Sequence, residues 1–252
     1  MPIYKKFASV YDQMNADMHS KKMIPYCKKI FKKFQIKPSI GLDLCCGTGS
    51  AILKFQEMGI TMSGLDQSAE MLAQATVKTK KVKVKLYQKS LPKFRIIDSK
   101  DSKKNIQYDL ITSFYDSLNY MLTEKDLSSA FQSVYKHLHT NGWFIFDMNT
   151  PNALKTIWDE QTYAGVQDSM AWVWQNDYNP IAKRAACHAT FFKKKGELWE
   201  RFDETHYEKG YSNSVIKKLL RENKFKIKGF YDCYTFEKPT RDSYRICAVV
   251  QK

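Results

Sequence analysis

The stretch Gly41-Leu42-Asp43-Leu44-Cys45-Cys46-Gly47-Thr48-Gly49-Ser50 indicates the fold of this chain. Apolar side chains at Ile40, Leu42 and Leu44 predict a buried strand, and two glycines then predict a tight turn. A helix-like run from Ser50 to Met58 follows the turn. Glycine lets the backbone approach a ligand closely, and the start of a helix presents free N–H groups. A strand, a glycine-rich turn and a helix in this order indicate a nucleotide-binding site.

A second apolar stretch makes this indication more specific. Residues Ile60 to Leu65 are expected to form the next strand, and Asp66 follows at its end, where an acidic residue suits the hydroxyls of a ribose. The dinucleotide fingerprint is excluded because Ile52 stands where that motif needs a third glycine. A P-loop is excluded because no Lys-Ser or Lys-Thr pair follows the glycines. The sequence therefore predicts a βαβ unit that binds a nucleoside.

These motifs resemble those of a known enzyme class. Residues 42–49 resemble motif I of the class I S-adenosylmethionine-dependent methyltransferases, and residues 64–68, continuing through Met71 and Leu72, resemble their second motif. The resemblance implies S-adenosyl-L-methionine as cofactor and S-adenosyl-L-homocysteine as product. It also implies an α/β fold with a Rossmann-like, seven-stranded, mostly parallel sheet, an antiparallel final hairpin strand and an inserted antiparallel β lid. A Rossmann-like unit that binds a different ligand, or none, is the alternative.

Three regions are expected along the chain. Residues 1–150 are expected to form the cofactor-binding core with N-terminal helices, 151–210 an inserted β lid that contacts substrate, and 211–252 a helix and hairpin that complete the core sheet. Within the first region, apolar spacing predicts a helix in residues 1–20 and another at 122–139. Alternating lysines predict a charged edge strand at 78–86, and the polar segment 97–106 predicts a surface loop.

The expected cofactor site lies at the carboxyl ends of the first strands, where ligands bind in open α/β sheets. Asp66 would bind the ribose, and the glycine turn would admit the methionine end. Tyr11 and the following Asp12 resemble a Tyr-Asp pair near the N-terminus of small-molecule N-methyltransferases. That resemblance implies that Tyr11 lies over the bound cofactor. Packing of Tyr11 on the protein core is the alternative. Ser90 stands where the family usually carries an acidic residue. The expected cofactor-binding residues are Tyr11, Asp43, Cys45, Gly47, Thr48, Gly49, Asp66, Gln67, Met71, Ser90, Leu91, Ser113 and Phe114.

The expected acceptor site uses polar residues that follow later strands. The segment 113–116 lacks the Asn/Asp-Pro-Pro-aromatic signature typical of methyltransferases that act on exocyclic amines of bases, and 116–120 resembles the small-molecule branch. In that branch a histidine placed like His206 faces the acceptor, although a packing role is equally expected. The expected catalytic residues are Asp116, Asn119 and His206, and the expected substrate-binding residues are Tyr115, Asn149 and Tyr211.

Composition limits the remaining possibilities. The 252 residues carry a net charge of +15, mostly from dispersed lysines, so nucleic acid is a possible partner but a solvated lysine surface is favoured. Neither a signal peptide nor a membrane span is evident, which predicts a cytoplasmic protein. The six cysteines form no C-x-x-C pair, so no metal site is expected. The oligomeric state stays open.

The predicted function is transfer of a methyl group from S-adenosylmethionine to a small-molecule acceptor, with an amine favoured. One alternative is a methyltransferase that acts on RNA or protein through the basic surface. A second alternative is a non-catalytic nucleoside-binding protein.

Overall fold

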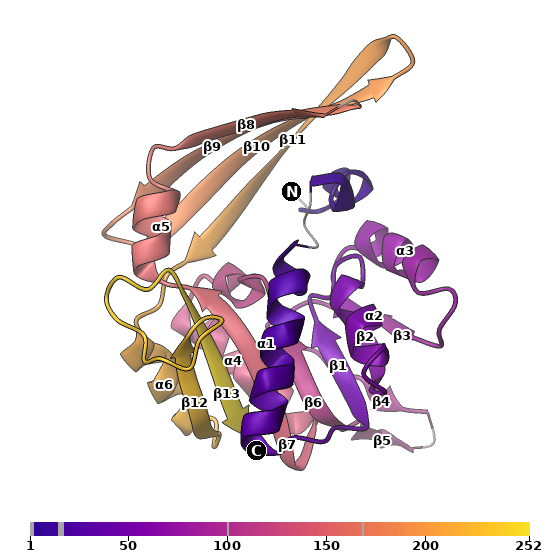
Figure 1. Cartoon of the computed structure of the whole chain (residues 1–252), viewed down its shortest axis with the longest axis vertical. Helices are drawn as coiled ribbons and strands as arrows, with labels where there is room; N and C mark the ends of the chain where they lie inside the picture. Colours follow the sequence, from indigo (N-terminus) through magenta and orange to yellow (C-terminus); the bar gives the residue numbers. More distant parts are fainter. Residues whose placement is uncertain (1–2, 15–17, 100, 168) are drawn as a thin grey trace.

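The computed structural model describes residues 3–14, 18–99, 101–167 and 169–252. A seven-stranded sheet forms the body, with strand order β12-β13-β7-β6-β1-β2-β3 (Figure 1). The strands β1, β2, β3, β6 and β7 are parallel neighbours, and β13 runs antiparallel between β7 and β12. This is the predicted Rossmann-like sheet with its antiparallel hairpin strand. The bounds are β1 Ile40–Leu44, β2 Thr61–Asp66, β3 Lys85–Gln88, β6 Tyr108–Ser113, β7 Leu138–Asn149, β12 Lys226–Asp232 and β13 Arg245–Gln251.

Helices cover both faces of this sheet. Apolar side chains such as Ile30 and Phe55 pack α1 and α2 on one face, and Phe131 and Leu220 pack α4 and α6 on the other. Among the described residues, no helix is long and apolar enough to cross a membrane. The bounds are α1 Met18–Phe34, α2 Ser50–Gln56, α3 Ala69–Lys78, α4 Glu124–Lys136, α5 Pro151–Ile157 and α6 Asn213–Glu222.

A second sheet is formed by the part of the chain between α5 and α6. Its four antiparallel strands, in the order β11-β10-β9-β8, extend away from the core sheet (Figure 1). Phe191 and Phe202 on this sheet pack against Phe7 and Val10, so the N-terminal segment lies against the lid. The inserted antiparallel lid was predicted, and the structure confirms it. The bounds are β8 Thr162–Gln167, β9 Met170–Asn179, β10 Arg184–Lys195 and β11 Leu198–Lys209.

The N-terminal segment differs from its prediction. Instead of one helix it forms two short 3-10 turns, Phe7–Ser9 and Asp12–Met14. The backbone of Tyr4 has a positive φ of 62°, and its N–H donates to the Glu204 carboxylate. Because this N–H group bonds the lid, it does not form a hydrogen bond within an α-helix. The contacts with the lid therefore outweigh the helical preference that the apolar spacing indicates.

Three other elements also differ from prediction. The edge strand spans only Lys85–Gln88, because the lysine-rich stretch before it ends α3 and forms a turn. The segment expected as a loop contains a small hairpin, β4 Ile97–Asp98 paired with β5 Asp101–Asn105. The helix expected at 122–139 is shorter, since β7 already begins at Leu138.

Candidate active site

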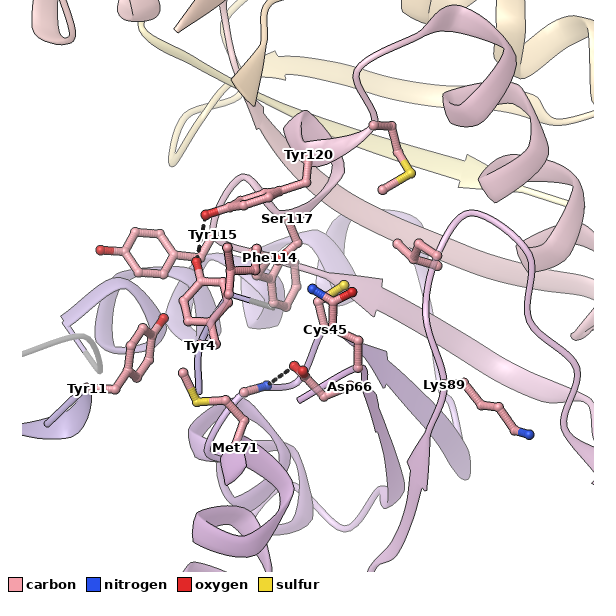
Figure 2. A pocket seen from close by; sticks show the side chains of 15 residues that line it. Tyr4, Tyr11, Cys45, Asp66, Met71, Lys89, Phe114, Tyr115, Ser117 and Tyr120 are labelled. Atoms are coloured by element: carbon pink, nitrogen blue, oxygen red, sulfur yellow. Dashed lines mark hydrogen bonds between the residues drawn. The ribbon is translucent and has the colours of Figure 1, made fainter. Parts of the chain in front are cut away.

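A cavity of about 300 Å³ opens at the carboxyl ends of the central strands. Cys45 follows β1, Asp66 ends β2 and Phe114 follows β6, and all three side chains line the cavity (Figure 2). Tyr4 and Tyr11 of the N-terminal segment line it from the opposite side. The cavity therefore lies where parallel α/β sheets bind ligands, and the N-terminal segment forms part of its wall.

Asp66 holds the glycine turn in place. Its Oδ2 accepts a 2.9 Å hydrogen bond from the Gly47 N–H, and its Oδ1 accepts one of 2.9 Å from the Ser68 N–H. Burial raises the pKa of Asp66, and the two N–H donors partly offset that rise. Ser68 also caps α3, because its side chain accepts a hydrogen bond from the Met71 N–H. A carboxylate fixed at a strand end and facing the cavity suits ribose hydroxyls.

The backbone of the glycine turn requires small residues. Gly47 and Gly49 have φ values of 52° and 80°, and Cys45 also has a positive φ of 54°. Glycine adopts this left-handed conformation at little cost. Asp43 lies below the turn and accepts a 2.6 Å hydrogen bond from Thr112 Oγ1. Burial raises the pKa of Asp43 to about 7. Asp43 therefore bonds the neighbouring strand β6 and does not line the main cavity.

A smaller cavity of about 60 Å³ adjoins the first and shares five lining residues with it. Asp43, Thr48 and His19 are among the residues that line only this second cavity. Thr48 Oγ1 donates to Asp12 at 2.7 Å, and Lys78 reaches both residues. Thr48 thus contacts the second cavity and also anchors the N-terminal segment. The shared residues are Tyr11, Cys45, Gly47, Phe114 and Tyr115.

Most of the expected cofactor-binding residues meet at these two cavities. Gln67, Met71 and Leu91 line the main cavity together with residues already described. Three expected residues line neither cavity: Gly49, which lies in the glycine turn, Ser90, which is exposed, and Ser113, which is fully buried. Ser90 follows the short edge strand β3. Successive side chains of an extended chain point in opposite directions, so a difference of one position is enough to direct a side chain away from the cavity.

The lid side of the cavity contains a chain of hydrogen bonds. The Tyr4 and Tyr120 hydroxyls lie 2.7 Å apart (Figure 2), and the Tyr120 hydroxyl lies 3.0 Å from His206 Nδ1. His206 Nε2 faces the Glu204 carboxylate at 3.6 Å. Burial lowers the pKa of His206 to about 4 and raises those of both tyrosines. At neutral pH the imidazole is uncharged, so it has the capacity to accept a proton.

A buried ionic network supports the turn after β6. Tyr115 and Asp116 both have positive φ, and their N–H groups donate to Asp147 at 3.1 and 2.8 Å. Arg245 Nη1 lies 2.8 Å from Asp147, and His19 Nε2 lies 2.7 Å from it. Burial alone would raise the pKa of Asp147, but these two partners lower it overall. The network thus fixes Tyr115, which lines the main cavity.

Three predicted acceptor residues have structural contacts instead. The fully buried Asn119 side chain bonds the backbone of Asn149 twice and the Lys209 carbonyl once, which joins the turn after β6 to β7 and the lid. The Asn149 side chain donates to Glu208, and the Tyr211 hydroxyl donates to the Met121 carbonyl. None of Asn119, Asn149 and Tyr211 lines the main cavity, because their polar groups bond the protein itself.

Asp116 lies beside the main cavity without lining it. Its carboxylate forms a 2.7 Å ion pair with Arg245. Burial and the neighbouring Asp116 carboxylate raise the pKa of Glu208 well above its ordinary value. Of the three predicted catalytic residues, His206 is therefore the one whose partner, Tyr120, reaches the cavity.

Several residues at the site were not predicted. Tyr4, Ser117, Tyr120 and Met121 line the cavity, and Glu204 binds its N-terminal wall. Tyr120 could have been predicted because it is the last residue of the polar segment 115–120, which follows β6. Tyr4 and Glu204 could not, because their positions depend on a contact between chain segments 200 residues apart.

Among the known proteins that resemble this chain are methyltransferases. Residues 42–142 match the family described as a methyltransferase domain. The chain is 29% identical over 251 residues to the protein named "Putative methyltransferase YqeM" of Bacillus subtilis, covering 99% of this chain and 97% of that one. It matches the crystal structure of a S-adenosylmethionine-dependent methyltransferase from Clostridium acetobutylicum with 29% identity and a TM-score of 0.85, covering 99% of both chains.

A more distant solved structure shares the fold as well. The sugar N-methyltransferase KedS8 from Streptoalloteichus matches with 16% identity and a TM-score of 0.74, covering 95% of this chain and 92% of that one. The sequence and the fold of the whole chain are thus similar to those of S-adenosylmethionine-dependent methyltransferases. They support a methyltransferase whose cofactor is S-adenosyl-L-methionine.

Proposed function

We propose that this enzyme methylates a nitrogen atom of a small-molecule acceptor. The observation that carries the proposal is the Tyr120–His206 pair, in which a hydroxyl at the cavity wall contacts a buried, uncharged imidazole. An amine attacks the methyl group through its lone pair, so a protonated acceptor must first give up a proton. The neutral imidazole, one hydroxyl away from the cavity, offers a lone pair for that proton.

The residues around the cavity fit the cofactor. Asp66 would hold the ribose hydroxyls, and the left-handed turn at Gly47 would leave room for the methionine end beside the smaller cavity. Met71, Leu91 and Phe114 would supply apolar walls for the adenine. When bound, the sulfonium supplies a methyl group that is already activated for transfer.

The protein's own contribution is orientation, exclusion of water and proton removal. Tyr4, Tyr115 and Tyr120 line the lid side of the cavity and would hold an acceptor against the cofactor. The proton released from the acceptor nitrogen would pass to the Tyr120 hydroxyl as that hydroxyl gives its own proton to His206 Nδ1. The cavity of about 300 Å³ favours a small acceptor over a folded macromolecule.

The comparisons support this choice without deciding it. KedS8, which shares the fold, is titled a sugar N-methyltransferase. The net charge of +15 makes RNA the second candidate acceptor. The test is a screen of amines, amino sugars and total RNA with radiolabelled cofactor and purified enzyme. Label that enters a small amine product, and does so at least tenfold more slowly with the Tyr120→Phe enzyme, supports the proposal; label only in RNA contradicts it.

A further inference from the structure

Glu204 lies on the lid strand β11 and bonds the backbone of the N-terminal segment. Its Oε2 accepts the Tyr4 N–H at 2.6 Å, and its Oε1 accepts the Lys5 and Phe7 N–H groups, each at 3.2 Å. The Glu204 side chain is only 7% exposed. Burial raises the pKa of Glu204, and the N–H donors of the segment partly offset that rise. A buried carboxylate that accepts three N–H groups is a specific anchor, since hydrogen bonds to a charged acceptor are stronger than neutral ones.

The anchored segment reaches the cofactor cavity directly. The Tyr4 carbonyl accepts a 2.9 Å hydrogen bond from Ser68 Oγ, and the Ser68 N–H donates to Asp66 at 2.9 Å. Two residues, Ser68 and Tyr4, therefore connect the carboxylate expected to hold the ribose with Glu204 on the lid. Tyr4 has a positive φ, a conformation that a non-glycine residue adopts only when its surroundings hold it.

Glu204 also faces the proposed proton acceptor. His206 Nε2 lies 3.6 Å from Glu204 Oε2, and among the described residues it has no hydrogen-bond partner. A carboxylate at this position favours the tautomer with the proton on Nε2. That tautomer leaves Nδ1 free to accept from the Tyr120 hydroxyl, which lies 3.0 Å away. One carboxylate thus contacts both the cavity wall at Tyr4 and the imidazole.

We propose that Glu204 is a positioning residue that couples cofactor binding to the lid, by holding Tyr4 against Ser68 and by orienting His206. The part that concerns His206 rests on the proposed function, whereas the part that concerns Tyr4 does not. Cofactor bound at Asp66 would stabilise the segment that contains Tyr4, and through Glu204 it would fix the lid that carries His206.

The test compares Glu204→Gln with Glu200→Gln. Glu200 lies on the same strand and also binds the N-terminal segment, but through an exposed 2.8 Å ion pair with Lys6, and such pairs contribute little. Calorimetry should show S-adenosylhomocysteine binding about tenfold weaker in the Glu204→Gln enzyme, as expected when a charged hydrogen-bond acceptor is lost. The Glu200→Gln enzyme should bind within twofold of wild type. Equal affinity in both variants would overturn the proposal.

Limited trypsin digestion supplies a second measurement, first on the wild-type enzyme and then on the two variants. Lys5 and Lys6 are exposed, and their cleavage removes the N-terminus that includes Tyr4. S-adenosylhomocysteine should slow this cleavage at least fivefold, and the Glu204→Gln enzyme should lose the protection while Glu200→Gln keeps it. Cleavage at the same rate with and without ligand would overturn the coupling.

Neither readout requires a methyl acceptor, so failure here is distinct from failure of the proposed function. The His206 part is measured separately, by the split between kcat and KM. The Glu204→Gln enzyme at saturating cofactor should still show kcat reduced about tenfold, since misorientation of His206 is not corrected by more cofactor. If kcat recovers fully at saturation, Glu204 does not orient His206.

Discussion

The Gly47 N–H donates a 2.9 Å hydrogen bond to Oδ2 of Asp66, so the turn after β1 is fastened to the end of β2. The bond connects two motifs 19 residues apart and leaves Asp66 at the cavity wall. The spacing between the glycine turn and Asp66 along the chain therefore places the two within hydrogen-bond distance of each other. The turn takes its shape partly from the residue that is expected to hold the ribose.

Replacing Asp66 with asparagine is expected to weaken S-adenosylhomocysteine binding at least tenfold. An asparagine amide presents one acceptor oxygen where the carboxylate presents two, so the Gly47 and Ser68 N–H groups and the ribose hydroxyls cannot all be satisfied. Calorimetric titration measures the effect. Asp242→Asn, at an exposed carboxylate, serves as the matched control and should bind as wild type does. Unchanged affinity in Asp66→Asn would contradict the ribose assignment.

The sequence predicted the core sheet correctly, and most of the expected cofactor-binding residues meet at its carboxyl edge, because both features depend on local patterns. Residues 42–49 and 64–66 carry a strand, a turn and an acid whose geometry follows from their own spacing. The parallel neighbours of β1 then bring Cys45, Asp66 and Phe114 to one edge without further information. The capped helix after Asp66 was predictable for the same reason.

The acceptor side was predicted less well, because its residues meet only through the tertiary fold. Asn119 lies in a polar segment after a strand, as a substrate-binding residue would, yet its amide bonds the backbone of two distant elements. Glu204 bonds a segment 200 residues away, and no local pattern indicates that contact. The N-terminal apolar spacing did indicate burial at Phe7 and Val10, but the bonds to Glu204 determine a non-helical backbone.

Replacing Tyr120 with phenylalanine is expected to lower kcat by roughly ten- to a hundredfold, the low end of what general acid–base catalysis contributes. The substitution keeps the ring but removes the hydroxyl that joins the cavity to His206. Affinity for S-adenosylhomocysteine should stay within twofold, since Asp66 and the glycine turn are untouched. Tyr207→Phe, at an exposed position on the same lid, is the control. A kcat equal to wild type would remove Tyr120 from the proton path.

The buried imidazole of His206 should make stability depend on pH. Its pKa is about 4 in the folded protein, below the ordinary value of about 6.5, so between these values the unfolded chain binds more protons. Stability contributed by neutral His206 is therefore complete above about pH 7 and is lost as pH falls toward 4. The loss amounts to about 3 kcal/mol over this range.

Urea unfolding of the wild-type and His206→Gln proteins at pH 7, 6, 5 and 4 measures this loss. The raised pKa of Asp43 acts in the opposite direction, but both proteins share it, so it cancels in the difference. The stability advantage of the wild type over His206→Gln should shrink steadily as pH falls. A difference that does not change between pH 7 and 4 would mean that His206 is not held in its neutral form.

The Asp147–Arg245 pair is expected to show strong coupling in a double-mutant cycle. Asp147 is fully buried, and the Asp147→Asn substitution leaves Arg245 with less compensation, for which about 3–5 kcal/mol of destabilisation is typical. Arg245→Met leaves Asp147 similarly uncompensated. The double variant leaves neither charge in the pair unpaired, so its destabilisation should be at least 1 kcal/mol smaller than the sum of the two single effects. Urea unfolding at pH 7 measures all four proteins. Strict additivity would mean that the two side chains act independently and that the turn carrying Tyr115 does not depend on their ion pair.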